Sequence, residues 1–592
     1  GINMLGTIKE IIHNQVIVEL SIDMSKQANF INLHLVFEDD KIKIVGEIVS
    51  STMTSVTVNI VGEIKDGIFL PGVSSKPSFR SQVRMITLEE LAMMLGPQTE
   101  TENTFPLGYS TIYQNYPIHV NINAFFSNHF AILGNSGSGK SFSVSRMLQN
   151  IFFDMQKAPL GASVFLFDAY GEYTNAFSNL AVTNPNLRYK TYTTNATFGD
   201  SDILKIPLWL LDVDDLALLL DATTPNQLPL LKKTLQLVPI LTGEEKDVIV
   251  AKNDIIARAV LDILLSGHQS SKIRDQVIAV LTKFHTSDLS LDSQIVQPGY
   301  TRSLKQCLYI DKMGKLQEME LVVNFVKSFI QEEQQEVAAS SKMIAYTLKD
   351  LETALDFALI SEGILKSDKV YDYANVLSVR LHSLVNSPNH VFFDRKTYLS
   401  RESFIRELLT SFDHKKCQIV NFNISYIDDR LAKVITKILS KLLFQAAVEN
   451  PKRGSVSYHI IIEEAHRYVQ KDTDTEILGY NIFDRITKEG RKYGVLLGLI
   501  TQRPSELSDT AISQCSNFLI LRTLHPKDLA YIKEMVPNIS IEVVDMLKNL
   551  KPGNCIAFGS AFLVPVHLYF LKPNPEPLSN NVNICQIWYH SV

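Results

Sequence analysis

The sequence predicts an α/β fold with a parallel sheet, preceded by a small β-barrel and interrupted by a helical insertion. Three observations lead to this prediction. An apolar strand at residues 130–133 runs into a glycine-rich turn and then into an amphipathic helix. Strands alternate with helices on both sides of a long middle stretch, which is typical of a parallel sheet covered by helices. Short β-branched runs fill residues 4–95.

Residues 4–95 are predicted to form the N-terminal barrel. The runs 15–20, 42–48 and 56–60 are rich in β-branched residues, and polar turns separate them. Closely spaced short strands favour a small barrel, and a β-sandwich is the alternative. Residues 88–95 are expected to form a short helix. Residues 96–106, with two prolines, are expected to be a linker.

The α/β core is predicted in two parts, residues 96–204 and residues 406–592. Between them, residues 205–405 are expected to be mostly helical, because apolar residues recur at intervals of three and four, as at Ile273, Val277 and Val280. Such stripes are most often plain helix cores. A strand at 417–422, a helix at 427–450 and a strand at 458–462 then resume the alternation. This order is that of a RecA-like parallel sheet with a helical insertion.

The glycine-rich turn is the strongest functional signal. It matches the phosphate-binding pattern G-x-x-x-x-G-K-[ST] in its required strand–turn–helix setting. Glycines let the backbone wrap a polyphosphate, and the amides at the helix start point at it. Lys140 is expected to neutralise the β- and γ-phosphates, and the Ser141 hydroxyl to hold Mg²⁺. The residues predicted to bind ATP here are Gly134, Asn135, Ser136, Gly137, Ser138, Gly139, Lys140, Ser141 and Phe142.

Two adjacent carboxylates, Glu463 and Glu464, follow a short apolar strand. At the carboxyl end of a parallel strand both acids can reach the phosphate side of the sheet. One acid can support hydrated Mg²⁺, and its neighbour can act as the general base for the attacking water. The alternative is a solvated acidic helix start, where carboxylates suit the dipole. A phosphate loop in the same chain favours the catalytic interpretation.

A third element lies around the strand 495–500. Gln502, just after this strand, is well placed to sense the γ-phosphate or to orient water. Arg491 lies in a basic turn before the strand, from which an arginine could reach a neighbouring subunit's γ-phosphate. The alternative is a basic surface loop, which is the favoured interpretation for Lys488 and Lys492.

These elements resemble the HerA family of hexameric DNA translocases, relatives of the FtsK pumps. The resemblance covers both ends of the chain, in order. One departure is Glu463, where the family usually has aspartate; the longer arm can still hold a water of the Mg²⁺ shell but can alter metal geometry. The matching blocks are residues 132–141, 167–173, 463–466, 489–494 and 501–505, with the closing stretch 547–573.

The resemblance implies an ATPase with Mg²⁺ as cofactor, a homo-hexamer, duplex DNA as substrate and a HAS-barrel-like N-terminal domain. It implies that Glu464 is the catalytic base, Arg491 the trans-acting finger and Gln502 the sensor. Lys140 completes the catalytic set, and Ser141 and Glu463 hold the metal. Asp168 and Glu172 match a block near the nucleotide or the subunit interface.

Composition agrees with a large enzyme of the cytoplasm. The chain has 592 residues, 45% of them apolar, and a net charge of −6. That charge argues against a protein that coats DNA from outside, but little against a ring whose pore residues are multiplied by symmetry. The five cysteines have no metal-type spacing, and reduced structural thiols are the simplest account. No apolar run is long enough to span a bilayer, so no membrane association is expected.

Three function classes remain open at this stage. The first is a DNA-translocating ring ATPase that works with an effector, either a NurA-type nuclease in DNA end processing or a sirtuin-like, nuclease or NADase subunit in antiphage defence. The second is a metabolic phosphotransferase, against which the insertion, the barrel and the Arg491 block argue. The third is an ATP-binding ring scaffold that regulates a partner nuclease or NADase without translocating.

Overall fold

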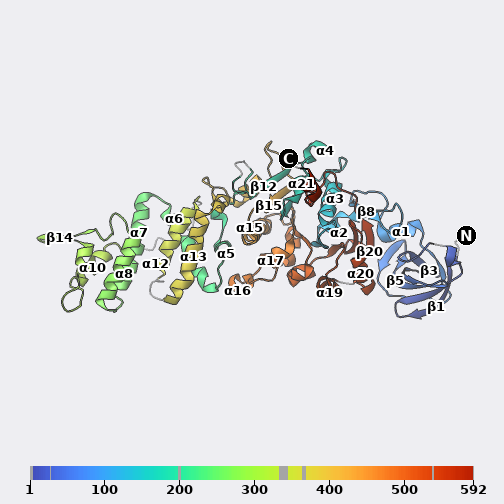
Figure 1. The fold of residues 1–592 in the computed structure, drawn as a ribbon, viewed down its shortest axis with the longest axis horizontal. Coiled ribbons are helices and arrows are strands. Elements are labelled where there is room, and N and C mark those ends of the chain that lie inside the picture. The colour runs from blue at the N-terminus through green and yellow to red at the C-terminus, as the bar shows by residue number, and fades with distance from the viewer. Residues whose placement is uncertain are drawn as a thin grey trace. The chain divides into compact units, whose positions relative to one another are not determined.

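The computed structural model describes residues 4–26, 28–197, 202–332, 344–362, 368–536, 539–579 and 581–590 (Figure 1). The chain forms two compact units. The first comprises Gly1–Thr194, Ile405–Asp472 and Asn481–Val592, and the second comprises Asn195–Phe404 and Thr473–Tyr480. The four predicted segments are finer than this division, and their boundaries stay a prediction.

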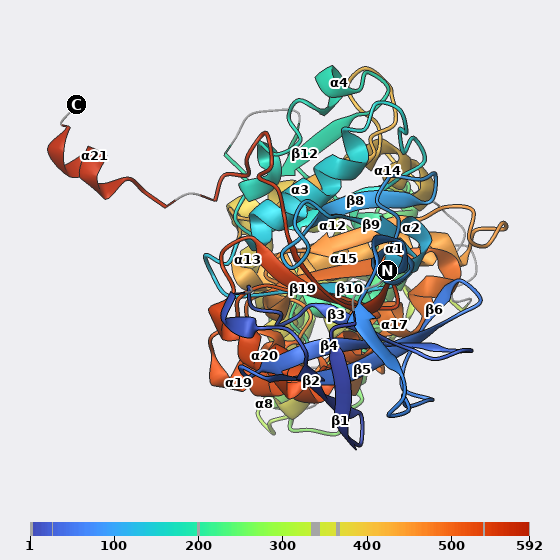
Figure 2. The same cartoon turned by 90° about the vertical axis from the view of Figure 1, so that its right-hand side faces the viewer.

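The N-terminal part of the first unit is a closed antiparallel barrel, as predicted. Its strands follow the order β2-β1-β7-β3-β4-β5, and β2 pairs again with β5 to close the ring (Figure 2). Buried residues alternate along β5, so Val56, Val58 and Ile60 fill the interior. The strands are β1 (Gly6–Ile12), β2 (Gln15–Leu20), β3 (His34–Glu38), β4 (Lys43–Ser51), β5 (Ser55–Lys65), β6 (Ile68–Pro71), which pairs with β5 outside the ring, and β7 (Gln82–Met85).

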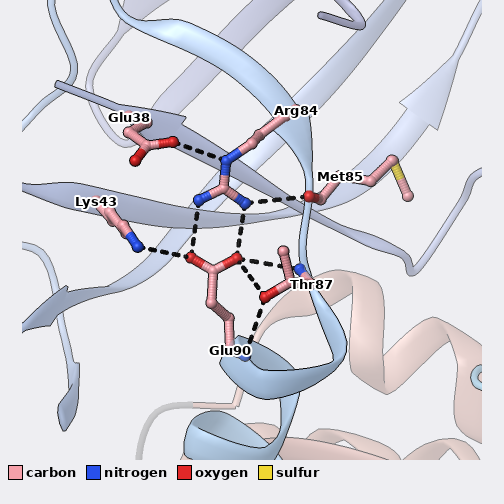
Figure 3. A network of polar contacts seen from close by, with 6 residues as sticks. All are labelled: Glu38, Lys43, Arg84, Met85, Thr87 and Glu90. Atoms are coloured by element: carbon pink, nitrogen blue, oxygen red, sulfur yellow. Dashed lines mark hydrogen bonds and ion pairs between the residues drawn. The ribbon is translucent and has the colours of Figure 1, made fainter. Parts of the chain in front are cut away.

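The predicted helix after the barrel is α1 (Leu88–Leu95), and a buried ion pair ties it to the barrel (Figure 3). Arg84, on β7, donates from Nη1 and Nη2 to the two carboxylate oxygens of Glu90 at 2.6 and 2.9 Å. Its Nε donates to Glu38 at 2.8 Å. Burial alone would raise the pKa of Glu90, but hydrogen bonds from Arg84 and Thr87 outweigh it and lower this pKa to about 2.

The predicted linker at 96–106 is partly wrong, because β8 (Thr104–Ser110) begins inside it. The misleading signal is Pro106, which normally interrupts a strand. In β8 the pairing with β9 shifts register between Pro106 and Gly108, so the proline sits at an irregularity where a missing N–H is tolerated.

The predicted parallel sheet is confirmed and forms the core of the first unit. Its order is β12-β15-β11-β16-β17-β10-β18-β19-β20-β8-β9, parallel from β12 to β18 and antiparallel beyond. The central strands are buried along their whole length, as expected for a sheet covered on both faces. The strands not yet bounded are β9 (Pro117–Asn121), β10 (Phe130–Leu133), β11 (Val164–Asp168), β12 (Tyr189–Thr193), β15 (Ile419–Asn423), β16 (Tyr458–Ile462), β17 (Val495–Thr501), β18 (Asn517–Ile520), β19 (Asn554–Gly559) and β20 (Phe562–Tyr569).

Amphipathic helices connect these strands. The helix after β10 buries Val144, Met147 and Leu148 in one cluster with residues of the neighbouring strands. The α-helices that lie wholly within this unit, besides α1, are α2 (Ile122–Phe126), α3 (Lys140–Phe152), α4 (Leu180–Thr183), α15 (Asp429–Val448), α17 (Ile482–Glu489), α18 (Asp509–Ser513), α19 (Pro526–Met535), α20 (Ile541–Met546) and α21 (Ile584–Tyr589).

The second unit is built mainly from helices. The predicted apolar stripe lies on α8, where Ile273, Val277 and Val280 are buried. Its larger elements are α5 (Val213–Leu219), α6 (Leu228–Leu241), α7 (Glu245–Leu264), α8 (Ser270–Lys283), α10 (Met319–Lys327), α12 (Leu348–Ser361) and α13 (Asp368–Asn386), with a hairpin of β13 (Gln294–Gln297) and β14 (Tyr300–Ser303). Each helix in the described parts of the chain is too short or too polar to cross a lipid bilayer.

Candidate nucleotide-binding site

A cavity of about 520 Å³ opens beyond the carboxyl ends of four neighbouring parallel strands, β11, β16, β17 and β10. Ligands of open parallel sheets bind at this edge. The cavity brings together most of the predicted site residues, although they come from distant parts of the sequence. It is lined by Ser136, Gly137, Gly139, Lys140, Ser141, Phe142, Tyr170, Glu172, Glu463, Glu464, Gln502, Pro552, Leu578, Ser579 and Asn581.

The phosphate loop connects β10 to α3, and two of its glycines need backbone freedom. Gly137 and Gly139 have φ of 78° and 95°, in the left-handed region that favours glycine. A Cβ on Gly139 would also lie 3.0 Å from the amide nitrogen of Gly553. Lys140 Nζ donates to the carbonyl oxygen of Asn135 at 3.0 Å, so the ammonium is held over the loop. Burial lowers the pKa of Lys140, and three nearby glutamates oppose that shift.

The two predicted acids follow β16 directly, and both are buried. Glu463 accepts a hydrogen bond of 2.5 Å from the hydroxyl of Tyr173, and burial raises the pKa of Glu463 to about 8. Glu464 has φ of 53°, a left-handed conformation that costs free energy in a residue with a side chain. This conformation turns the chain sharply at the end of the strand, where Glu464 reaches the cavity. Burial also raises the pKa of Glu464.

A buried histidine links Glu464 to the next strand. His466 Nε2 lies 3.3 Å from Glu464 Oε2, and His466 Nδ1 lies 2.8 Å from Thr501 Oγ1. Burial lowers the pKa of His466, so the ring is neutral at pH 7. The hydrogen bond between Nδ1 and the Thr501 hydroxyl holds the imidazole beside the Glu464 carboxylate. Gln502, the residue after Thr501, places Nε2 3.5 Å from Glu464 Oε2.

Asp168 and Glu172 have different positions at this site. Asp168 is fully buried and does not line the cavity; its carboxylate accepts from the amides of Glu172 and Tyr173, each at 3.0 Å. Burial raises the pKa of Asp168 to about 6. Glu172 does line the cavity and accepts from the Ser141 hydroxyl at 2.5 Å. Asp168 therefore shapes the turn that carries Glu172.

Three residues of the predicted loop also lie outside the cavity lining. Asn135 N donates to the carbonyl of Arg522 at 2.8 Å, which anchors the loop to the end of β18. Gly134 approaches Leu521 so closely that a Cβ would lie 2.9 Å from its Cβ. Ser138 is buried, and its hydroxyl lacks a hydrogen-bond partner among the described residues. These three residues support the part of the loop that lines the cavity, which is Ser136, Gly137, Gly139, Lys140 and Ser141.

Arg491 is not part of this cavity. It is exposed on the single turn Gly490–Tyr493 and lines a separate hollow of about 480 Å³ with Phe558 and Phe562. The structure therefore brings Lys140, Glu464 and Gln502 together within one chain, and leaves Arg491 elsewhere on the same unit.

Sequence reasoning missed several residues of the site. Tyr173 lies inside a block that the sequence singled out for its acids, but its contact with Glu463 spans 290 positions. Tyr170 lines the cavity, and the guanidinium of Arg467 lies 5.0 Å from its ring centroid. Leu578 and Ser579 come from a C-terminal segment without a motif. The available signal for Tyr173 was its place within the block 167–173; we find none for Leu578.

Residues 105–304 match the family model described as "Helicase HerA, central domain". This stretch contains the phosphate loop and the Asp168–Glu172 turn. The resemblance to the HerA family is confirmed. A DNA double-strand break repair helicase HerA of Sulfolobus acidocaldarius is 30% identical over 176 residues, which are 29% of this chain and 35% of that protein. The match thus spans about a third of that HerA protein.

Longer and weaker matches extend across the chain. The HerA of Pyrococcus furiosus, described in the same words, is 23% identical over 521 residues, 87% of this chain and 77% of that protein. VirB4 of Thermoanaerobacter pseudethanolicus is a distant structural neighbour, with 15% identity, a TM-score of 0.42 and coverage of 80% of this chain and 98% of that one.

The residues of the cavity fit a magnesium–triphosphate complex. The loop supplies amides and Lys140 for an anion. The buried Ser138 hydroxyl without a partner shows a loop whose polar atoms are not all satisfied within the chain. Ser141 and Glu463 supply the oxygen ligands that Mg²⁺ prefers. The chemistry of this donor set therefore suits a triphosphate bound with Mg²⁺.

Proposed function

We propose that this chain is a magnesium-dependent ATPase that moves along duplex DNA as a homo-hexamer. The observation that carries the proposal is the convergence of Lys140, Ser141, Glu463, Glu464 and Gln502 on one cavity. Phosphate-binding loops are common, but a loop facing paired acids and an amide at the ends of adjacent strands is the arrangement needed to hydrolyse a triphosphate.

The residues divide the reaction between them. Glu464 accepts the proton of the water whose oxygen attacks the γ-phosphorus, and the bond to the bridging β–γ oxygen breaks to leave ADP. Lys140 stabilises the charge on the β- and γ-phosphates, and Gln502 orients the water or the γ-phosphate. Mg²⁺, when bound by Ser141 and Glu463, supplies positive charge at the phosphate oxygens.

Arg491 acts in trans in this proposal. Its exposure, and its position outside the cavity of its own chain, support a role at a neighbouring subunit's γ-phosphate. A site that needs a neighbour's arginine would be complete only in the assembled ring. Hydrolysis would then be coupled to subunit contacts, as a translocating motor requires.

The similarity to DNA double-strand break repair helicases supports a role in DNA processing. We infer that the motor works in a prokaryotic cytoplasm beside a separate effector, which is a NurA-type nuclease in DNA end processing or a sirtuin-like, nuclease or NADase subunit in antiphage defence.

A second candidate function is an ATP-binding ring scaffold that regulates such a partner without translocating. The residue that favours this function is Glu463, which stands where the family usually has aspartate. Its carboxylate is buried and accepts a hydrogen bond from the hydroxyl of Tyr173. A carboxyl held in this way can slow metal binding and turnover while leaving nucleotide binding intact.

A strand-displacement assay separates the two candidates. The purified chain is given ATP, Mg²⁺ and a duplex that carries a third strand, and release of that strand reports movement along the duplex. A motor releases the third strand only when ATP is present, and the Glu464→Gln variant releases none. A ring that binds ATP and duplex, but releases no strand even with its effector present, supports the scaffold instead.

A further inference from the structure

We propose that residues 572–579, here called the strap, form the nucleoside-binding wall of the ATP site. In this proposal the side chain of Leu578 packs against the purine, and the hydroxyl of Ser579 bonds to a polar edge of the nucleoside. The inference rests on the proposed function and deepens it: the phosphate loop holds the triphosphate, and the strap holds the base and the sugar.

One end of the strap is fixed to α3, the helix that begins with Lys140. Arg146 Nη1 donates to the carbonyl of Lys572 at 3.0 Å. Gln149 makes two bonds with the strap, because the amide of Asn574 donates to its Oε1 at 3.0 Å and its Nε2 donates to the carbonyl of Pro575 at 2.9 Å. The Gln149 side chain is buried, so these bonds are shielded from water. The strap therefore keeps a fixed position on the phosphate-binding helix.

The other end of the strap is fixed to the turn that carries Glu172. Asn175 Nδ2 donates to the carbonyl of Glu576 at 3.0 Å, and the amide of Leu578 donates to the carbonyl of Glu172 at 2.8 Å. Both bonds use main-chain atoms of the strap. Replacement of the Leu578 side chain therefore leaves the anchoring intact, which makes this side chain a clean target for a test.

The side chains that the strap brings to the cavity suit a nucleoside. Leu578 is 62% exposed and lines the cavity with Phe142, Tyr170 and Pro552, so four separate segments bring apolar or aromatic surface to the site. A purine face is a planar apolar surface of the kind that such residues cover. The other lining residues are those of the phosphate loop, the three glutamates, Gln502, Ser579 and Asn581.

The hydroxyl of Ser579, at the wall of the cavity, lacks a hydrogen-bond partner among the described residues. Its Oγ is buried, although Ser579 lines the cavity. Buried hydroxyls are nearly always bonded, so an unbonded one at a cavity wall points to a group supplied by a ligand. A base edge or a ribose hydroxyl is such a group.

The test compares two ligands that share their phosphates, ATP and inorganic tripolyphosphate, each with Mg²⁺. Binding to the full chain is measured by calorimetry for the wild type, Leu578→Ser and Ser579→Ala. Leu571→Ser is the matched control, because Leu571 is a partly exposed leucine of the same C-terminal stretch outside the cavity lining. We expect Leu578→Ser to raise the Kd of ATP about tenfold. Ser579→Ala should raise it about fivefold. The Kd of tripolyphosphate should stay unchanged in both.

Two results would overturn the proposal. Equal weakening of ATP and tripolyphosphate means that the strap only supports the phosphate loop, and unchanged ATP binding means that it does not touch the nucleoside. Failure of the proposed function gives a different result. If the wild type binds neither ATP nor tripolyphosphate, the chain has no ATP site at all. If the wild type hydrolyses ATP and Leu578→Ser binds ATP with the same Kd as the wild type, only the strap proposal fails.

Discussion

Nε2 of His466 lies 3.3 Å from Oε2 of Glu464, and the other nitrogen of the same ring is bonded to Thr501. The imidazole thus joins the proposed general base to the end of β17, the strand that presents Gln502. Because the ring is neutral and is held beside Glu464 by Thr501, it positions the carboxylate without taking its proton. His466 is a positioning residue in this account.

Substitution of His466 should therefore affect turnover more than nucleotide binding. We expect His466→Ala to lower the kcat of ATP hydrolysis about a hundredfold, because a misplaced base loses the aligned geometry. The KM for ATP should change less than about twofold, since the phosphates are held elsewhere. His466→Gln, whose side-chain amide can bond to Thr501 and lie beside Glu464, should recover part of the rate. His285→Ala, at an exposed position, serves as the control. A rise in KM with kcat unchanged would contradict the assigned role.

Tyr173 is predicted to tune the metal through Glu463. Tyr173→Phe removes the hydroxyl that donates to this carboxylate and leaves the ring packing in place. Loss of such a supporting bond should raise the Mg²⁺ concentration needed for half-maximal activity about tenfold. Magnesium titration of ATPase activity measures this change, with Tyr426→Phe, at an exposed tyrosine, for comparison. An unaltered magnesium requirement would show that Tyr173 does not orient Glu463.

The Arg84–Glu90 pair is predicted to stabilise the junction of the barrel and α1. Arg84→Met leaves a buried carboxylate without its main partner and should cost about 3–5 kcal/mol of stability. Lys43→Met removes a half-exposed partner of the same carboxylate and should cost less than about 1 kcal/mol. Chemical denaturation measures the loss of unfolding free energy in each variant, and hydrogen exchange of the barrel amides shows whether the loss lies in the barrel. Equal losses would contradict the dominance of the buried pair.

The same pair predicts a pH dependence. The pKa of Glu90 is lowered from its ordinary 4.5 to about 2, so the ionised group favours the folded state. Its contribution is fully present above pH 4.5 and is lost as the pH falls through about 2. The difference in unfolding free energy between wild type and Glu90→Gln should thus be constant near neutrality and shrink in acid. A difference that grows as the pH falls would contradict the shift.

Arg491 is predicted to complete a neighbour's site. Arg491→Ala and Glu464→Gln should each abolish hydrolysis when tested alone. Mixed rings contain interfaces with an intact base on one side and an intact arginine on the other, so a mixture of the two variants should recover part of the rate. Lys492→Ala is the control for charge in the same turn. If the mixture stays inactive although subunits exchange, Arg491 does not act in trans.

The sequence was most informative where one short segment carries the whole function. The phosphate loop is continuous from Gly134 to Ser141, and its neighbouring strand and helix confirm its setting, so its position could be predicted. The paired acids after β16 could be predicted for the same reason. Local chemistry was misleading at Pro106, where a strand irregularity tolerates a residue that normally breaks strands.

The contacts that sequence could not provide join distant segments. His466 meets Thr501 across 35 positions, and the Asn574 amide meets Gln149 across 425. Tyr173 has only its place in the block 167–173 as a signal and Leu578 has none, because each meets its neighbours only when the fold brings distant segments together. These residues are where the structure adds most to the functional interpretation.

The proposed function is tested most sharply by the rate of ATP hydrolysis of the wild type and of Glu464→Gln, with the binding of ATP measured in parallel. We expect magnesium-dependent hydrolysis that duplex DNA accelerates, and a Glu464→Gln chain that binds ATP with unchanged affinity but does not split it. Hydrolysis that survives in Glu464→Gln, or a wild type that binds ATP and never hydrolyses it with magnesium and duplex present, would contradict the proposed function.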